Sequence, residues 1–516
     1  MLIKEIQSIS RSIPGLTKAN PEKLLEVTFN LKSIINILIK FIFIRILEVK
    51  YSVLLLILPL TICGCAIHSD PATLDMVLPK QWNEAANNAP QPDMNWWSSF
   101  NSAELEQLIA IALAESPDMT IATERVRQAE AAVRSAGSSL FPSLSLDASS
   151  GSRRTSSDSD GSTTADSSSA GLGVSYEVDL WGRIGAGKRA AEASLEGSRY
   201  DQETARLTLT TGVANAYFQV LVTRARLDVA RNNLAIAERL MRIVDVQYRN
   251  GTASALDLSR QTTAVLTTRA AVPPLEVQER QTLSALAILL GRQPQGFALG
   301  AGAIGDLAIP EIGAGLPSEL LTRRPDLAST EAQLRAADAN VDAARAALLP
   351  SVKLSGSGGL STSELFSMGD PVRSLGLTGS LAQSIFDGGR LRSQVAISES
   401  QRRQLLESYR AAILTALKEV EDALSNAERY RQQEIAQMAI RDESARSLHL
   451  AELRLREGAD DLSTVLEAQR TLYSAEDQLA QLRQSRLSSA VDIVKAVGGG
   501  WQRGVDSGTT ARQESP

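Results

Sequence analysis

Residues 116–146 read SPDMTIATERVRQAEAAVRSAGSSLFPSLSL, and residues 324–354 read RPDLASTEAQLRAADANVDAARAALLPSVKL. The two stretches align without a gap, so that Pro117 matches Pro325 and Pro142 matches Pro350. Each copy runs from a helix start to a proline and then to a strand. A repeated helix–strand unit indicates one half-structure built twice around a pseudo-symmetry axis, which favours a tube or ring over a pocket.

The composition excludes several classes of function. Only 4% of the 516 residues are aromatic, which is low for a set of compact globular cores, whereas Ala, Leu, Gln and Arg are typical of long helices. The net charge of −6 gives no basic footprint for nucleic acid. His68 and His449 lie far apart in the sequence, so we expect no histidine-based metal site. The sequence also shows no combination of nucleophile and general base that would indicate an enzyme.

Residues 1–64 are expected to be a leader with a lipoprotein signal. The end of this stretch has a basic start, a short apolar run and small residues before Cys65, which is typical of a secretory signal and too short for a membrane anchor. The ending Ile-Cys-Gly-Cys resembles a bacterial lipobox, so the Cys65 thiol is expected to carry the lipid. Ala66 follows in place of the aspartate associated with inner-membrane retention, which favours the outer membrane. The alternative is a chance cysteine after an ordinary signal.

A second apolar stretch lies within residues 1–48 and is interrupted by Lys40 and Arg45. Either these residues lie upstream of the true start, near Val49, or they form an inner-membrane helix. They do not enter the fold argument.

Period-two patterning predicts four strands, at about 142–152, 170–180, 350–361 and 373–386. Each is about as long as a tilted strand that crosses a bilayer. Glu177 and Asp179 lie opposite the apolar side chains of their strand, as in a barrel with a wet lumen; a soluble two-faced sheet is the alternative. The Ser/Asp/Thr-rich residues 153–169 are predicted to be a solvated loop. Four strands cannot close a barrel in lipid, so other copies of the chain must complete it, and the periodicity does not choose between eight and twelve strands.

A long helical hairpin follows each strand pair, at about 185–291 and 391–497. Residues recur every seven positions in two offset series, which predicts coiled-coil seams. In the first hairpin the main series is Val213, Val220, Leu227, Leu234, Met241 and Tyr248, and its mostly small partners are Ala216, Thr223, Ala230, Ala237 and Val244. In the second hairpin the two series are Leu406, Ile413, Val420 and Ala427, and Tyr409, Ala416, Ala423 and Tyr430. The hairpin turns contain Gly251 and Gly458, which suit left-handed helix caps. Ser254, and either Asp460 or Asp461, are expected to cap the returning helices.

These elements divide the mature chain into a first repeat, 65–310, and a second repeat, 311–501. A polar tail, 502–516, is expected to be disordered.

Five strings join these patterns: Leu316–Leu327 (LPSELLTRRPDL), Phe386–Arg390 (FDGGR), Tyr176–Arg183 (YEVDLWGR), Leu466–Tyr473 (LEAQRTLY) and Gly498–Trp501 (GGGW). Taken together, they make the chain similar to the TolC family of outer-membrane efflux channels, in the lipid-anchored subgroup that serves multidrug pumps of the RND type.

The resemblance implies a mainly α fold with a membrane β-barrel part. Three protomers with four strands each would form a twelve-stranded barrel, continuous with a trimeric α-helical barrel in the periplasm. The implied partners are a periplasmic adaptor (membrane fusion) protein, an inner-membrane pump and outer-membrane lipid, with no nucleic acid and no cofactor beyond the covalent lipid, such as palmitate, on Cys65. The implied function is a passive exit duct for drugs or other small toxic compounds. Export of metal ions, polysaccharide or protein, and a non-pore structural coiled-coil lipoprotein, remain alternatives.

The resemblance also implies roles for single residues. The helical tips would dock the adaptor through Gly251, Thr252, Ala253, Gly458 and Ala459. Glu467 occupies the position of a carboxylate that faces the closed pore, although an Asp is expected there, and three copies would form a ring that attracts cations; a solvated helix face is the alternative. Asp460 and Asp461 would add to this ring or act only as caps. Trp181 and Phe386 would form an aromatic girdle at the membrane interface, or would pack locally.

Overall fold

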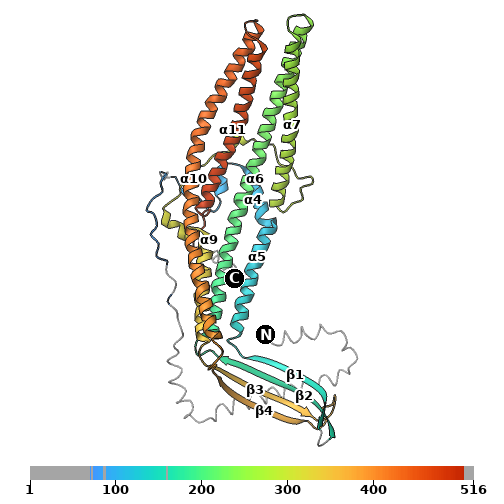
Figure 1. Ribbon diagram of the computed structural model, residues 1–516, viewed down its shortest axis with the longest axis vertical. Coiled ribbons are helices and arrows are strands. Elements are labelled where there is room, and N and C mark those ends of the chain that lie inside the picture. The colour runs from blue at the N-terminus through green and yellow to red at the C-terminus, as the bar shows by residue number, and fades with distance from the viewer. Residues whose placement is uncertain (1–69, 71–73, 85–88, 158–160, 505–516) are drawn as a thin grey trace, which may run out of the picture. The chain divides into compact units, whose positions relative to one another are not determined.

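The computed structural model describes residues 70, 74–84, 89–157 and 161–504. The leader 1–64 and Cys65 lie outside the described residues. Helices dominate the described part of the chain, with one small sheet (Figure 1). Within these residues, no helix is both long enough and apolar enough to span a membrane.

The two helical hairpins have matching lengths. The first consists of α6 (Arg183–Arg249) and α7 (Ala255–Leu289), and the second of α10 (Arg390–Arg456) and α11 (Leu462–Ala496). Both first helices have 67 residues and both second helices have 35. Figure 1 shows the two members of each hairpin side by side. The expected hairpins at about 185–291 and 391–497 thus correspond to these helices.

Shorter helices precede the strand pair in each half. They are α4 (Ala103–Glu115), α5 (Pro117–Ser138), α8 (Leu320–Arg323) and α9 (Pro325–Ala346), with 3-10 turns η1 (Trp96–Phe100), η2 (Ile304–Asp306) and η3 (Pro317–Glu319). Helices α5 and α9 each have 22 residues and begin with a proline, whose missing N–H is harmless in the first turn. Each leads into a strand, and both pack along α6.

The sheet is antiparallel, in the order β1-β2-β3-β4, with strands β1 (Ser143–Ser157), β2 (Gly161–Val178), β3 (Ser351–Thr362) and β4 (Val372–Ala382). The four predicted strands are therefore present. The predicted loop at 153–169 is wrong, because β1 continues to Ser157 and β2 begins at Gly161. Cross-strand hydroxyl pairs support this extension: the Oγ atoms of Ser149 and Ser169 lie 2.9 Å apart.

The register gives the sheet two chemically different faces. Rows of paired residues on one face, here named the apolar face, include Leu144–Val174–Gly356–Leu377 and Leu146–Leu172–Gly358–Leu375. On the opposite face, here named the serine face, the rows include Ser143–Ser175–Ser355–Thr378 and Asp147–Gly171–Gly359–Ser374. The apolar side chains are solvent-exposed in the isolated chain, with Leu375 at 86% and Leu377 at 89%.

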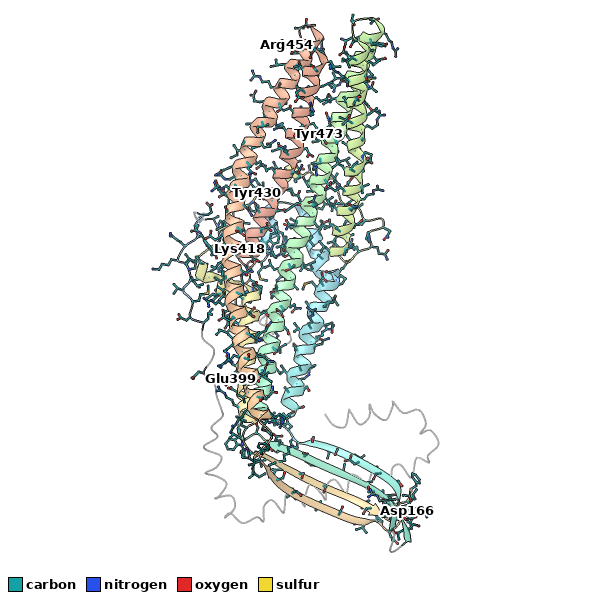
Figure 2. The ribbon with its side chains drawn as sticks, viewed as in Figure 1. Asp166, Glu399, Lys418, Tyr430, Arg454 and Tyr473 are labelled. Carbon is teal, nitrogen blue, oxygen red and sulfur yellow. The ribbon has the colours of Figure 1, made fainter. Side chains whose placement is uncertain are left out.

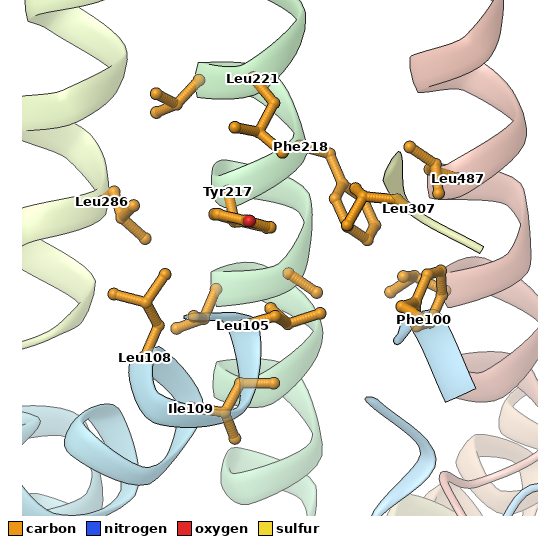
Figure 3. Packing of buried hydrophobic residues seen from close by; sticks show 14 of the residues in the cluster. Phe100, Leu105, Leu108, Ile109, Tyr217, Phe218, Leu221, Leu286, Leu307 and Leu487 are labelled. Carbon is orange, nitrogen blue, oxygen red and sulfur yellow. The ribbon is translucent and has the colours of Figure 1, made fainter. Parts of the chain in front are cut away.

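The largest apolar core lies where α4 packs against α6 (Figure 3). Phe100 and Phe218 are fully buried, and their ring centroids are 5.3 Å apart. Leu286 of α7 and Leu487 of α11 contribute to the same cluster. This core therefore joins both hairpins at the level of the linker between the two halves.

The coiled-coil pattern is only partly realised in α6. Val213, Val220 and Leu227 are buried as predicted, but Tyr248 is 43% exposed. The predicted partner positions Thr223, Ala230, Ala237 and Val244 are buried, and Leu240 is buried beside them. The seam therefore continues towards the tip on the partner series, because a straight helix repeats every 3.6 residues and drifts away from a strict seven-residue repeat.

The chain beyond Trp501 is ordered further than predicted. The Arg503 side chain donates to Glu331 at 2.6 Å, and its backbone N–H donates to the Thr322 carbonyl at 3.0 Å. The expected tail at 502–516 is therefore wrong for its first residues, and residues 505–516 lie outside the described part.

Candidate functional site

The two hairpin turns have the same backbone construction. Gly251 and Gly458 have φ values of +76° and +68°, in the left-handed region that glycine adopts most easily. In the first turn the Thr252 N–H donates to the Gln247 carbonyl at 2.9 Å, and in the second the Ala459 N–H donates to the Arg454 carbonyl at 2.9 Å. Both bonds span six residues, as in a Schellman motif.

Polar side chains then restart the returning helices. The Ser254 hydroxyl accepts from the Asp257 N–H, and the Asp257 carboxylate accepts from the Ser254 N–H, which completes a capping box on α7. On α11 the Asp461 carboxylate accepts from the Thr464 N–H at 3.2 Å. Asp461 is thus the cap, which decides between the two predicted aspartates, while Asp460 pairs with Arg454 at 3.3 Å.

Hydrogen bonds at the caps favour the charged form of both capping carboxylates. The Ser254 hydroxyl, followed by the Ser254 N–H, lowers the pKa of Asp257. The Ser463 hydroxyl, followed by the Thr464 N–H, lowers the pKa of Asp461. Asp461 also acts against the lowered pKa of Asp257 through its like charge. The two tips therefore carry negative charges that repel each other.

The tip residues differ in exposure. Gly251, Thr252, Gly458 and Ala459 are exposed, and Ala253 is half-buried. Figure 2 shows Arg454 at the end of α10, next to its turn. These backbone turns are open to a partner, and adaptor docking stays a prediction.

Glu467 lies on an exposed face of α11, where its carboxylate pairs with Arg470 one turn further along. This ion pair is local and both side chains are mostly exposed. The position allows a pore-facing ring in an assembly, but each carboxylate would enter that ring beside a guanidinium. The role of Glu467 at a constriction stays a prediction.

A groove of 600 Å³ lies next to this site between α7 and α11, with α6 at its base. Its lining is mostly small and polar: Ala230, Asn233, Ser259, Arg260, Thr263, Ala264, Thr267, Thr268, Ala271, Leu466, Gln469, Arg470 and Tyr473. At its base the Gln469 amide donates to Asn233 Oδ1 at 2.8 Å. This bond links α11 to α6 at the residue that precedes Arg470.

Further links between the hairpins were missed from sequence. The Arg226 guanidinium of α6 binds both carboxylate oxygens of Asp477 on α11, at 2.6 Å and 3.3 Å. Within the second hairpin, Glu434 of α10, only 3% exposed, pairs with Arg486 of α11. No local sequence signal identifies such pairs, because their partners are far apart in the chain.

A buried arginine joins the start of the second half to the end of α11. Arg324 donates to Asp326 at 2.8 Å, to Glu419 at 2.7 Å and to the Ala496 carbonyl at 3.0 Å. Burial lowers the pKa of Arg324, but hydrogen bonds to Asp326 and Glu419 outweigh it and raise the pKa. The residue lies in the LPSELLTRRPDL string, so that string serves a structural contact.

The two aromatic residues expected at the membrane interface have different surroundings. Trp181 follows β2 after a short gap, and its Nε1–H donates to the Pro350 carbonyl at 2.7 Å. Phe386 lies beyond the end of β4 and is 90% exposed. The Trp181 ring is thus held by the start of the β3 strand region, whereas the Phe386 ring is exposed, and an aromatic girdle of the two residues stays a prediction. Within the described residues, no group of three or more His, Cys, Asp or Glu side chains could hold a metal ion.

Comparison with known proteins adds an independent line of evidence. The family described as "Outer membrane efflux protein" matches residues 108–292 and 316–499. The pyoverdine export outer membrane protein OpmQ of Pseudomonas aeruginosa is 42% identical over 452 residues, which cover 85% of this chain and 94% of OpmQ. The probable efflux pump outer membrane protein TtgC of Pseudomonas putida is 31% identical, with 85% and 93% coverage. The open-state structure of the Neisseria gonorrhoeae MtrE outer membrane channel superposes with a TM-score of 0.74 at 26% identity, covering 86% of this chain and 99% of MtrE.

Proposed function

This chain belongs to the outer membrane efflux protein family. From that premise we propose that three copies of it form an exit duct whose wall has no unpaired strand edges. The protein is an outer-membrane efflux component that extends into the periplasm. In the proposed assembly the four strands of each protomer contribute to a twelve-stranded barrel, and the hairpins α6–α7 and α10–α11 line up into a helical barrel. The two halves of each protomer act as structural repeats.

The observation that supports this assembly is the two-faced sheet with open edges. Within the described residues, β1 and β4 each have one strand neighbour only. Unpaired edges cannot remain in a hydrocarbon layer, so other copies must pair with them. The apolar face then meets lipid and the serine face lines a wet lumen. Family membership also favours a pore over a structural lipoprotein without one.

The partners follow from the two ends of the duct. We expect the exposed turns at 251–253 and 458–459 to dock a periplasmic adaptor, which couples the duct to an inner-membrane pump of the RND type. Cys65 is expected to carry a lipid that anchors the chain to the outer membrane. The duct itself performs no chemistry, since energy is supplied at the inner membrane.

The exported compound belongs to one of two classes. The general expectation is a set of drugs or small toxic compounds. The 42% identity to a pyoverdine export protein, against 31% to an efflux pump protein, favours pyoverdine or a similar metabolite as a second candidate.

Deletion of the gene tests the proposal, with cell-associated antibiotic and cell-associated pyoverdine both measured in the deletion strain. Accumulation that reverts on complementation supports the duct and identifies the substrate class. The oligomer is tested by the mass of the detergent-solubilised protein. A folded monomer in detergent would contradict the proposal. So would equal accumulation of both compound classes in the deletion strain and in a parent strain whose outer membrane contains the protein.

A further inference from the structure

The end of the apolar face can be located on all four strands. The last apolar row runs Ala148–Ala170–Leu360 and meets Arg373 on β4. The next row outward is Ser150–Ser168–Thr362, which consists only of hydroxyl side chains. Because consecutive rows on one face are about 7 Å apart along a strand, the change from apolar to polar is abrupt. Arg373 is exposed and makes no side-chain hydrogen bond or ion pair with any described residue, so its guanidinium is free to reach lipid headgroups.

The loop between β3 and β4, residues 363–371, lies on this same face. Three side chains of the hydroxyl row bind its backbone. The Phe366 N–H donates to Ser150 Oγ at 3.0 Å, Ser168 Oγ donates to the Glu364 carbonyl at 2.7 Å, and Thr362 Oγ1 donates to the Gly369 carbonyl at 3.2 Å. Ser150 and Ser168 are also 2.8 Å apart. Side chains of one row point to one face of a sheet, so the loop is laid over the apolar face and not over the serine face.

The loop presents apolar side chains where it is held. Phe366 is 85% exposed, Met368 is 42% exposed and Leu365 is 37% exposed. Phe366 has φ +52°, an uncommon conformation for a bulky residue. The hydrogen bond from its N–H to Ser150 helps to hold this backbone, and the ring is directed away from the rest of the chain. Figure 2 marks this end of the sheet by Asp166.

We propose that loop 363–371 is a membrane anchor, which inserts Phe366, Leu365 and Met368 into the outer leaflet at the headgroup level, outside the barrel. The inference rests on the proposed barrel, because the apolar face must meet lipid. A loop held outside by its hydroxyl row leaves the lumen open at that end. Aromatic and aliphatic side chains partition into the interfacial layer of a bilayer. Insertion would therefore remove the exposed ring from water.

The test is spin-label accessibility in the full-length protein reconstituted into liposomes. A nitroxide is attached at Phe366→Cys, and its collision rates with oxygen, which concentrates in lipid, and with a water-soluble nickel complex are compared. Two control positions on β4 define the scale: Leu375→Cys on the apolar face and Ser374→Cys on the serine face. The parent protein, treated in parallel, gives the background from its own cysteines.

We expect the oxygen-to-nickel ratio at Phe366→Cys to be close to that at Leu375→Cys and several times that at Ser374→Cys. A ratio as low as that at Ser374→Cys, with the two controls still well separated, would overturn the anchor while the barrel stands. Controls that do not separate would instead contradict the barrel. If the Phe366→Cys protein cannot be reconstituted into liposomes, the Met368→Cys protein is measured instead, with the same expected ratio. Replacing Ser150 and Ser168 by Ala should lower the ratio at Met368→Cys towards the aqueous value, because the loop loses its attachment.

Discussion

Arg226 of α6 donates hydrogen bonds to both carboxylate oxygens of Asp477 on α11, and this pair joins the two hairpins of one protomer. Both side chains are less than one-quarter exposed. Gln481 also donates to the same carboxylate at 2.6 Å. The pair therefore opposes any movement of α11 away from α6.

Breaking this pair should make the duct open more often. The variants Arg226→Gln and Asp477→Asn each remove a hydrogen-bonded charge that contributes about 1.5–3 kcal/mol, and an opening that separates α11 from α6 would then become at least about tenfold more frequent. Single-channel recording in planar bilayers measures the opening frequency. The control is Glu276→Gln, which breaks the half-exposed Arg231–Glu276 pair within the first hairpin and should change little. Equal opening in all variants would show that α11 does not move at this pair.

Alanine at the tip glycines should lower export more than it lowers stability. No atom lies within 4 Å of a Cβ at Gly251 or Gly458, so the cost comes from the left-handed backbone, about 1–2 kcal/mol. Gly296→Ala is a matched control, because its φ is +78° and its Cβ is equally free. Thermal midpoints should fall alike in the three variants, whereas drug accumulation in cells should rise only in the tip variants. An equal loss of export in Gly296→Ala would argue against docking at the tips.

The capping carboxylates should make the tips sensitive to acid. Since hydrogen bonds lower the pKa of Asp257 and of Asp461 in the folded state, their stabilising effect is present above the unfolded pKa, about 4, and is lost as the pH falls through the lower folded value. The protection of amides in the first turns of α7 and α11 against hydrogen exchange, corrected for the intrinsic exchange rate at each pH, should therefore fall as the pH drops below the unfolded value. The variant Asp461→Asn should weaken this pH dependence on α11 and leave the dependence on α7 in place, since removal of the like charge lowers the pKa of Asp257 further. Unchanged dependence in that variant would assign the effect to other groups.

Charge at Glu467 should set the ion preference of the duct if three copies face the lumen. In Glu467→Gln the paired Arg470 is left unbalanced, so the reversal potential in a salt gradient should shift towards anions, and Arg470→Gln should shift it towards cations. Glu443→Gln breaks a pair of the same spacing on α10 and serves as control. If it shifts the potential as much as Glu467→Gln does, the ring is not at Glu467.

Local sequence chemistry predicted the elements that depend on neighbouring residues. The glycine turns and the Ser254 cap are short-range features, and both could be located from residue type alone. The strand extension beyond 153 was missed because Ser, Thr, Asp and Gly are poor strand formers, and only the cross-strand hydroxyl pairs reveal why they pair. The Arg226–Asp477 contact joins residues more than two hundred positions apart, and neither residue lies in a motif. The heptad predicted the burial of Ala237 and Val244 near the tip, but not the exposure of Tyr248, because a straight helix drifts away from a strict seven-residue repeat.

The equal lengths of α6 and α10, and of α7 and α11, restrict how such a chain can evolve. Adding a single residue to α6 rotates everything beyond it by about 100° and shifts it by about 1.5 Å relative to α7. Insertions of about seven residues, or a multiple of seven, largely avoid the rotation. They still make one helix of the duct longer than the helices beside it. Relatives with longer or shorter ducts should therefore differ by whole heptads, gained or lost together at matching heights in all four helices.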